Sequence, residues 1–254
     1  MDTTRRRAWC LVSLRPQGGH APLRRVAARH GIGMLALSPW RLQPRTDAAT
    51  RQVLDAALEA DVVLFTSPAA VHAAAALRPL GPACAQRTCA GVGAGTAAAL
   101  RRHGVAHPLA PQRMDSEGLL ALPAFAAPAH VGLVTAPGGR GMIAAELARR
   151  GAALVRADVY ARVAVAPSSR ALAGLRALDV PACIALSSEE ALRTVLARVP
   201  EDVAAILRRC RVAAASARLA AVAGELGFGA ATLADSARPA DLVDAARAAM
   251  HASD

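Results

Sequence analysis

The chain has 254 residues, of which 54% are apolar and only 2% aromatic, so it can bury one large core or two medium ones built mainly from Ala, Leu and Val. Its formal charge is +11, and all 30 basic side chains are Arg because the sequence contains no Lys. The missing Lys excludes a Walker A lysine and every covalent mechanism that uses a lysine amine.

Short apolar runs alternate with helical patterns along the whole chain. Strands are predicted at 8–14, 33–37, 62–65, 89–92, 131–135, 152–159, 183–186, 212–215 and 230–233. Helices are predicted at 22–30, 49–60, 68–78, 96–103, 116–122, 141–150, 168–178, 189–199, 217–226 and 240–250, and Gly31, Gly104, Gly151 and Gly227 mark helix ends. Such alternation favours an α/β fold of parallel sheets flanked by helices.

A faint internal repeat underlies this alternation. The segment 64–67 (LFTS) resembles 185–188 (ALSS), and a second hydroxyl residue follows 29 residues later in both copies, Thr96 after Ser67 and Ser216 after Ser187. The segment 11–13 with Gly31 likewise resembles 133–135 with Gly151. Two βα units used twice predict two similar domains.

Hydroxyl residues stand at four predicted strand-to-helix junctions. They are Ser67, Thr96, the pair Ser187 and Ser188, and Ser216. Each can simply cap a helix by accepting a backbone N–H bond. Together they favour an anion-binding cleft, because ligands of open α/β sheets bind at the carboxyl ends of the strands, where helix starts attract anions.

Two further features are ambiguous by themselves. The loop 137–141 contains Gly139 and Arg140 and is either a tight turn or a place where backbone N–H groups and a forked donor meet a carboxylate. Tyr160, the only tyrosine, stands at the end of a predicted strand and is either a packing residue or a functional hydroxyl. The role of Arg15, which follows the first predicted strand, is equally ambiguous from its position alone. The segment 91–96 reads GxGxxT, which is weak as a dinucleotide fingerprint.

Cysteine and histidine spacing gives no sign of a metal site. The five cysteines form no CxxC pair, and Gly104 separates His103 from His107. An odd cysteine count and the lack of a convincing signal peptide or unbroken apolar span predict a soluble, cytoplasmic protein with no membrane attachment. We expect no metal and no organic cofactor.

The order of motifs resembles that of uroporphyrinogen-III synthases over nearly the whole chain. The matching segments are 14–16 (LRP), 65–71 (FTSPAAV), 90–97 (AGVGAGTA), 138–140 (GGR), 159–162 (VYAR), Ser187–Ser188 and 216–228. Leu14 and Ala69 stand where that family usually has Thr and Asn, and Ser216 where Thr is common.

This resemblance implies two similar flavodoxin-like domains joined by two connecting strands, near 35–39 and 160–167. One domain would comprise 1–37 and 165–254, and the other, inserted between them, 40–160. The implied activity is cyclisation of hydroxymethylbilane to uroporphyrinogen III, by a cytoplasmic and cofactor-free lyase that we expect to be a monomer. Tyr160 would be the catalytic acid. Arg15, Ser67, Thr96, Gly139, Arg140, Ser187, Ser188 and Ser216 would bind the substrate.

The sequence is also compatible with other functional classes. A non-catalytic tetrapyrrole- or anion-binding regulatory protein of the same fold would be consistent with Leu14 and Ala69. A two-lobed solute-binding protein should carry an export signal. A nucleic-acid module should carry aromatic platforms or a clustered basic stripe, and we expect no nucleic-acid partner.

Overall fold

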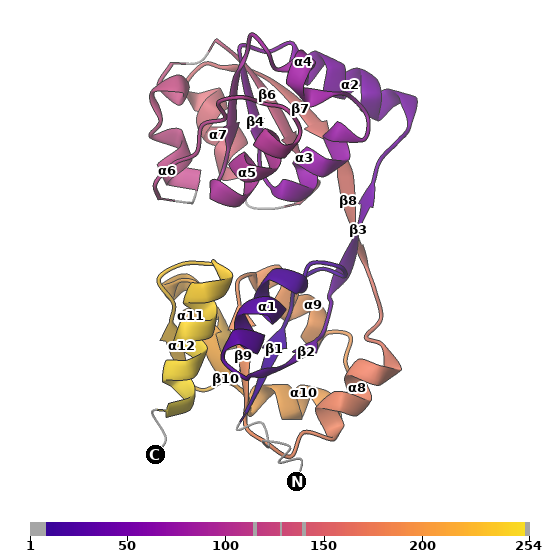
Figure 1. Ribbon diagram of the computed structural model, residues 1–254, viewed down its shortest axis with the longest axis vertical. Coiled ribbons are helices and arrows are strands. Elements are labelled where there is room, and N and C mark those ends of the chain that lie inside the picture. The colour runs from indigo at the N-terminus through magenta and orange to yellow at the C-terminus, as the bar shows by residue number, and fades with distance from the viewer. Residues whose placement is uncertain (1–8, 114–115, 128, 139–140, 252–254) are drawn as a thin grey trace. The chain divides into compact units, whose positions relative to one another are not determined.

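A computed structural model describes residues 9–113, 116–127, 129–138 and 141–251. The chain divides into two compact units (Figure 1). Unit 1 takes the chain up to Arg41 and again from Val163 onward, and unit 2 runs from Leu42 to Arg162. Each unit has its own parallel sheet, which confirms the predicted α/β fold.

Unit 1 is built on a parallel sheet with helices on both faces. Its strands are β1 (Cys10–Ser13), β2 (Gly33–Ala36), β9 (Ala182–Leu186), β10 (Arg211–Ala214) and β11 (Ala231–Leu233). Its helices are α1 (Ala21–Arg29), α8 (Ser169–Arg176), α9 (Glu189–Leu196), α10 (Glu201–Arg208), α11 (Ala217–Glu225) and α12 (Pro239–His251). The spatial order β2-β1-β9-β10-β11 corresponds to 2-1-3-4-5 in chain order, which is the flavodoxin-like arrangement.

Unit 2 repeats this plan with one strand fewer in its described sheet. Its strands are β4 (Val62–Phe65), β5 (Thr88–Gly91), β6 (His130–Thr135) and β7 (Ala153–Asp158). Its helices are α2 (Ala48–Leu58), α3 (Pro68–Ala75), α4 (Leu80–Ala83), α5 (Ala94–Arg102), α6 (Ser116–Leu120), the 3-10 turn η1 (Pro123–Phe125) and α7 (Met142–Arg149). The order β5-β4-β6-β7 is 2-1-3-4 in chain order, so the direction of winding reverses between β4 and β6.

The strand β4 shows why the apolar runs form central strands. Val62 and Leu64 belong to one buried cluster, and Val63 and Phe65 belong to another. Because successive side chains of a strand point to opposite faces, β4 is buried on both faces of its sheet. A strand covered by helices on both sides needs an uninterrupted apolar sequence, and this is what the run Val62–Phe65 supplies.

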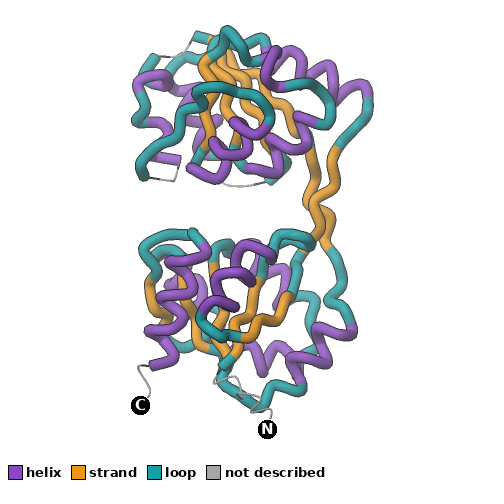
Figure 2. The backbone as a smooth tube through the Cα atoms, viewed as in Figure 1, coloured by secondary structure: helices purple, strands orange, loops and turns teal. Residues whose placement is uncertain are grey.

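Two short strands connect the units. β3 (Trp40–Pro44) and β8 (Tyr160–Ala164) form a two-stranded sheet where the chain passes from one unit to the other (Figure 2). The first connecting strand lies later than the expected 35–39, because Leu35 and Ala36 pair with β1 in the sheet of unit 1. Tyr160 begins β8, whereas the sequence suggested that it ends the preceding strand.

The predicted helix ends are confirmed by backbone conformation. Gly31, Gly104, Gly151 and Gly227 follow α1, α5, α7 and α11 with φ angles of 69°, 87°, 82° and 85°. These left-handed angles terminate helices and favour glycine over any residue with a Cβ atom.

Candidate active site

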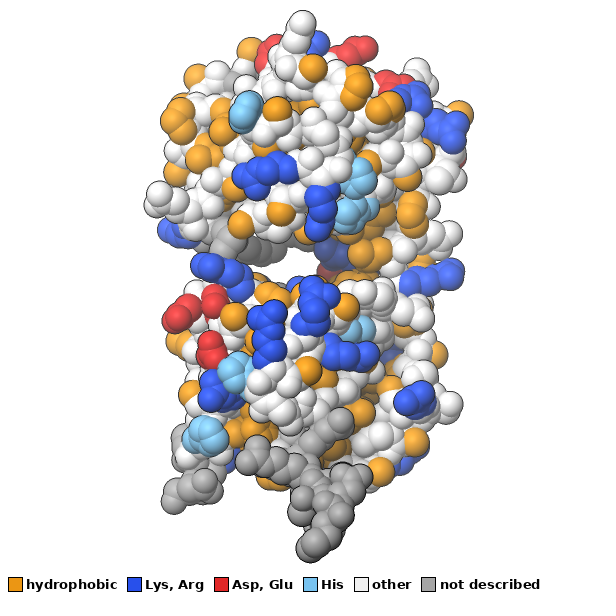
Figure 3. Space-filling view, viewed as in Figure 1, with side chains coloured by type: hydrophobic (Ala, Val, Ile, Leu, Met, Phe, Trp, Pro, Cys, Tyr) orange, Lys and Arg blue, Asp and Glu red, His pale blue; other side chains and the backbone are white. Residues whose placement is uncertain are grey.

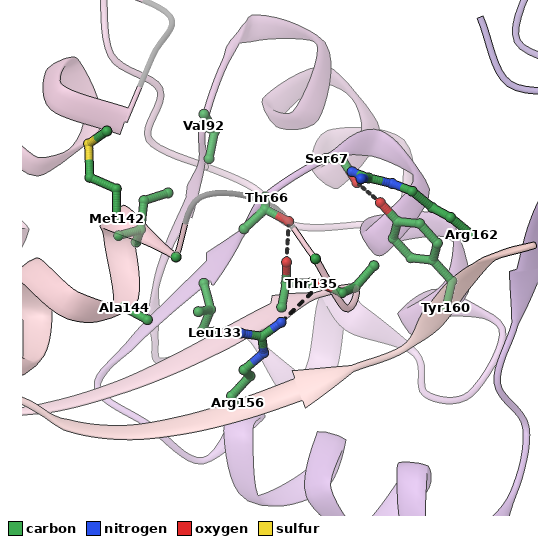
Figure 4. Close-up of a pocket in the computed structure, with 14 residues that line it drawn as sticks. Thr66, Ser67, Val92, Leu133, Thr135, Met142, Ala144, Arg156, Tyr160 and Arg162 are labelled. Carbon is green, nitrogen blue, oxygen red and sulfur yellow. Dashed lines mark hydrogen bonds between the residues drawn. The ribbon is translucent and has the colours of Figure 1, made fainter. Parts of the chain in front are cut away.

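A cavity of about 270 Å³ opens at the carboxyl end of the unit 2 sheet. It is lined by the ends of β4 and β6, by β7 and β8, and by the start of α7 (Figure 4). This is the point where the strand order reverses, and open α/β sheets bind their ligands at such points. Val92, Leu133, Met142 and Ile143 give the cavity an apolar wall.

Ser67 and Tyr160 meet at this cavity although they are far apart in the sequence. Ser67 caps α3, and its Oγ accepts a hydrogen bond from the Ala70 N–H at 3.1 Å. The same Oγ lies 3.1 Å from the Tyr160 hydroxyl oxygen. Tyr160 is only 5% exposed, and its ring belongs to the core beside Val159 and Phe65. Two of the predicted site residues are therefore hydrogen-bonded to each other.

A second hydroxyl pair in the cavity was not predicted from the sequence. The Oγ1 atoms of Thr66 and Thr135 are 2.8 Å apart. The parallel register, which pairs Phe65 with Val134, brings these two threonines together at the ends of β4 and β6. Each threonine stands directly after the apolar residues of a predicted strand, and this position can be recognised in the sequence. That the two threonines contact each other depends on β4 and β6 being neighbours in the sheet.

Two arginines supply positive charge on the cavity wall. Neither was among the predicted site residues, although Arg162 belongs to the matching segment 159–162. Arg156 of β7 donates from Nη2 to the Ala136 carbonyl at 3.0 Å and from Nε to Asp158 at 3.1 Å. Arg162 of β8 lines the same cavity (Figure 4). Arg156 thereby ties β7 to the glycine loop that follows β6.

The predicted residues Gly139 and Arg140 lie outside the described residues. The glycines on either side of them, Gly138 and Gly141, line the cavity with φ angles of 87° and 65°. Gly141 is the residue that precedes the first turn of α7.

Thr96 does not occupy the position that the sequence suggested. The helix α5 begins at Ala94 and is preceded by Gly93, so Thr96 is the third helical residue and not the cap. Thr96 is 4% exposed and packs on Gly91, where an added Cβ atom would lie 2.8 Å from the Thr96 Cβ. Glycine is itself a good N-cap residue, so the start of α5 carries no hydroxyl group that would mark it in the sequence.

The predicted residues of unit 1 gather at the carboxyl ends of three adjacent strands. Ser187 and Ser188 follow β9, Ser216 follows β10, and Arg15 follows β1 by one residue. Ser188 accepts from the Ala191 N–H at 3.2 Å and Ser216 from the Leu219 N–H at 3.4 Å. Both serines therefore cap helices, which is one of the two roles that the sequence allowed. They lie beside the reversal point of this sheet, between β1 and β9.

Arg15 is held at this edge of the sheet by a hydrogen bond and by partial burial. Its Nη2 donates to the Ala237 carbonyl at 3.1 Å. Burial lowers the pKa of its guanidinium from the usual value, although arginine still carries its charge near neutral pH.

A buried histidine network near Arg15 was also missed. His20 Nδ1 lies 2.9 Å from Ser13 Oγ, and its Nε2 lies 2.8 Å from Ser38 Oγ. Burial, followed by the charges of Arg24 and Arg15, lowers the pKa of His20. A single histidine after two glycines forms no sequence pattern that would predict hydrogen bonds to both serines.

Arginine side chains are present on the visible face of each unit, together with uncharged and some acidic side chains (Figure 3). Many are paired with carboxylates, for example Arg78 with Asp55 and Arg176 with Asp202. Part of the positive charge is thus balanced by neighbouring carboxylates.

A family model covers most of the chain, and solved structures share its fold. A family model described as uroporphyrinogen-III synthase HemD matches residues 21–244. A crystal structure of a mutant uroporphyrinogen III synthase from Thermus thermophilus aligns over 97% of this chain and 100% of that chain, with a TM-score of 0.64 and 17% identity. Uroporphyrinogen-III synthetase from Helicobacter pylori aligns over 94% and 98%, with a TM-score of 0.62 and 14% identity. At these identities the two structures establish the fold alone. A search of curated proteins found no match.

Proposed function

The chain belongs to the uroporphyrinogen-III synthase family, and we propose that the cavity of unit 2 is where it activates its substrate. The reaction cyclises hydroxymethylbilane to uroporphyrinogen III with inversion of ring D and loss of water, in tetrapyrrole biosynthesis, and the chain is thus a cyclising lyase. One observation carries the proposal: hydroxyl groups and arginines lie beside apolar side chains at the reversal point of the sheet. Pyrrole rings can pack on the apolar side chains, and carboxylates can bind to the hydroxyl groups and arginines.

The substrate carboxylates bind at helix starts and to arginines. In unit 2 the proposed binding residues are Ser67, Thr96, Gly139 and Arg140, and in unit 1 they are Arg15, Ser187, Ser188 and Ser216. Backbone N–H groups at the starts of α3, α9 and α11 supply donors and the positive ends of the helix dipoles. The partly buried guanidinium of Arg15 supplies a full charge.

Catalysis combines conformational selection with acid assistance. Without an enzyme the substrate closes spontaneously to the uninverted isomer, so holding one folded conformation directs the outcome. Loss of the terminal hydroxyl gives an electrophilic azafulvene, which the far pyrrole attacks through its substituted carbon to form a spiro intermediate that fragments and recloses inverted. Tyr160, buried and hydrogen-bonded at the cavity, assists departure of the hydroxyl.

The remaining properties form part of the same proposal. The enzyme acts in the cytoplasm as a monomer, without metal or organic cofactor, and has no nucleic-acid partner. None of the described helices is long and apolar enough to cross a membrane. The proposed domains comprise residues 1–37 with 165–254, and residues 40–160. Their boundaries lie near the division of the chain at Arg41–Leu42 and Arg162–Val163.

The rival reading is a non-catalytic binding protein of the same fold. No observation on the described residues favours it. Complementation separates the two: the gene is expressed in a bacterium that lacks its own uroporphyrinogen-III synthase and requires added haem. Growth without haem supports the enzyme. Failure to grow, with the protein present in the soluble extract at the level of a complementing control enzyme, supports the rival.

A further inference from the structure

Ser67 differs from the other helix-capping serines by its contact with a tyrosine. Ser168, Ser188 and Ser216 cap α8, α9 and α11, each accepting one backbone N–H bond at 3.2, 3.2 and 3.4 Å. Ser67 makes the same bond and, in addition, lies 3.1 Å from the hydroxyl of Tyr160 (Figure 4). The chain contains one tyrosine, so no second junction can have this pairing.

The hydrogen bond between Ser67 and Tyr160 uses only one of their two hydroxyl protons. A serine hydroxyl has one proton and two acceptor positions, and the Ala70 N–H occupies one acceptor position of Ser67. Only one proton can lie between Ser67 and Tyr160, so one hydroxyl proton of the pair is left over. A phenol is the stronger acid, and the favoured arrangement has Tyr160 donating to Ser67. The Ser67 proton is then the one available to a ligand.

The position of Ser67 favours this role. Tyr160 is 5% exposed, whereas Ser67 is half-buried and lines the cavity. Ser67 also sits at the N-terminus of α3, where the positive end of the helix dipole stabilises negative charge on its oxygen as the proton departs. Accepting two hydrogen bonds at once polarises its O–H bond further. The separation of 3.1 Å between the two oxygens is within the reach of proton transfer.

We propose that Tyr160 and Ser67 form a proton relay in which Ser67, and not Tyr160, protonates the departing hydroxyl; this rests on the function proposed above. The Ser67 O–H bond breaks and its proton joins the substrate hydroxyl, whose C–O bond breaks to release water. The Tyr160 O–H bond breaks at the same time, its proton moves to the Ser67 oxygen, and a phenolate remains. The proton that the substrate loses when the macrocycle closes restores the phenol, so the cycle balances without any co-reactant.

The test is a double-mutant cycle with the wild-type enzyme as reference. The variants are Ser67→Ala, Tyr160→Phe and both together, assayed for the rate of forming the inverted isomer. Each single change should lower kcat about 10²-fold, at the lower end of what one positioned acid contributes, with little change in KM. The double variant should lose no more than either single variant, because each change breaks the same relay. Ser67→Thr, which keeps the hydroxyl, should recover most of the rate.

Controls separate chemistry from helix capping. Ser168→Ala removes an equivalent cap outside the site and should leave kcat unchanged. If Ser67→Ala melts at a much lower temperature, Ser67→Gly removes the hydroxyl while keeping a residue that caps almost as well, and it should show the same loss of rate.

Three results would overturn the relay while leaving the proposed function intact. They are losses that multiply to about 10⁴-fold in the double variant, a kcat for Ser67→Ala equal to that of Ser168→Ala, and a Ser67→Thr variant as slow as Ser67→Ala. A wild-type protein that forms no inverted isomer rejects the proposed function, and the relay falls with it.

Discussion

Among individual residues, His20 shows how a buried polar side chain can join separate segments. Both ring nitrogens are used, one by Ser13 at the end of β1 and one by Ser38 after β2. A neutral imidazole offers one donor and one acceptor, which two hydroxyls can match. Protonation would place a charge in a buried site near Arg24 and Arg15, and the pKa of His20 is therefore lowered.

This lowered pKa predicts how the stability of the protein depends on pH. The folded state holds His20 neutral at pH values where the unfolded chain, with a pKa of about 6.5, already binds a proton. The stabilisation is complete above about pH 6.5 and is lost as pH falls toward the folded pKa. His20→Gln, which cannot be protonated, should flatten this part of the curve. Free energies of unfolding from urea titrations between about pH 7.5 and pH 5 would measure it; equal slopes for both proteins would contradict the assignment.

A second prediction concerns carboxylate binding at the start of α11. Ala217→Pro removes the first helical N–H while keeping a residue that helices tolerate at this position. It should raise KM several-fold with little change in melting temperature. Ser216→Ala keeps that N–H and should cost about 1 kcal/mol of stability through its lost cap, with a smaller effect on KM. The reverse ranking of the two KM values would show that the hydroxyl, and not the backbone, binds the substrate.

The sequence could identify single site residues but not their partners. Ser67 was selected by its place after a strand, and Tyr160 by the resemblance of the segment 159–162 to a known family. They are 93 positions apart, and their hydrogen bond depends on the path of β8. Thr66 and Thr135 were not selected because their proximity depends on strand order. Thr96 was misassigned because glycine, which has no side-chain signal, caps α5.

Among the helices and strands, the close packing of α2 on β6 depends on one glycine. A Cβ atom added to Gly132 would lie 1.8 Å from the carbonyl oxygen of Ala57, so the helix backbone would have to move away from the sheet. Ala57 is fully buried and belongs to the core that contains Leu54 and Phe65. The strand therefore needs glycine here in spite of its low strand propensity.

Gly132→Ala should therefore destabilise the protein strongly. Displacing α2 opens a packed core, and overpacking of this kind costs about 1–3 kcal/mol or more. Gly224→Ala is the matched control, because the new methyl group would meet nothing within 4 Å and replaces glycine inside α11. It should stabilise the protein by about 0.5–1 kcal/mol. Urea denaturation of both variants measures the contrast, and similar stabilities for the two would contradict the described packing.

Continuously apolar strands were predicted well, whereas the largely exposed strand β3 and the amphipathic helix α10 were missed. The run Val62–Phe65 matches β4 because a doubly covered strand must be apolar throughout. β3 contains Arg41, Gln43 and Pro44 and is largely exposed, so no apolar pattern marked it. Helix α10 was missed altogether, although Pro200 before it and the acidic Glu201 and Asp202 in its first turn are typical signals of a helix start.

Along the chain as a whole, the two units carry the same sheet order with their parts permuted. Unit 1 runs β2-β1-β9-β10 and unit 2 runs β7-β6-β4-β5 in the matching direction. In this alignment the segment β1–α1–β2 corresponds to β6–α7–β7, although the first stands at the start of its unit and the second at the end. The repeat seen in the sequence pairs these same segments, since 11–13 resembles 133–135 and 64–67 resembles 185–188. Both candidate binding regions lie at the reversal points that this shared order creates.

One prediction applies to the enzyme as a whole. The purified protein should be colourless and should keep its cyclase activity after exhaustive dialysis against a chelator, because the chemistry proposed here uses hydroxyl protons and arginine charges. Activity is compared before dialysis, after dialysis, and after adding back divalent metals. Activity that disappears on dialysis and returns with one metal would contradict a cofactor-free mechanism.

The decisive experiment identifies the product that the protein makes from hydroxymethylbilane. The purified chain is incubated with fresh substrate, the product is oxidised to the porphyrin, and the isomers are separated beside a reaction without protein. Catalysed inversion of ring D predicts mainly the type III isomer with the wild-type protein, and mainly type III at a lower rate with Tyr160→Phe, because the conformation imposed on the substrate survives that change. A product with protein that is the same type I isomer as the spontaneous reaction would contradict the assignment of this chain as an active cyclase.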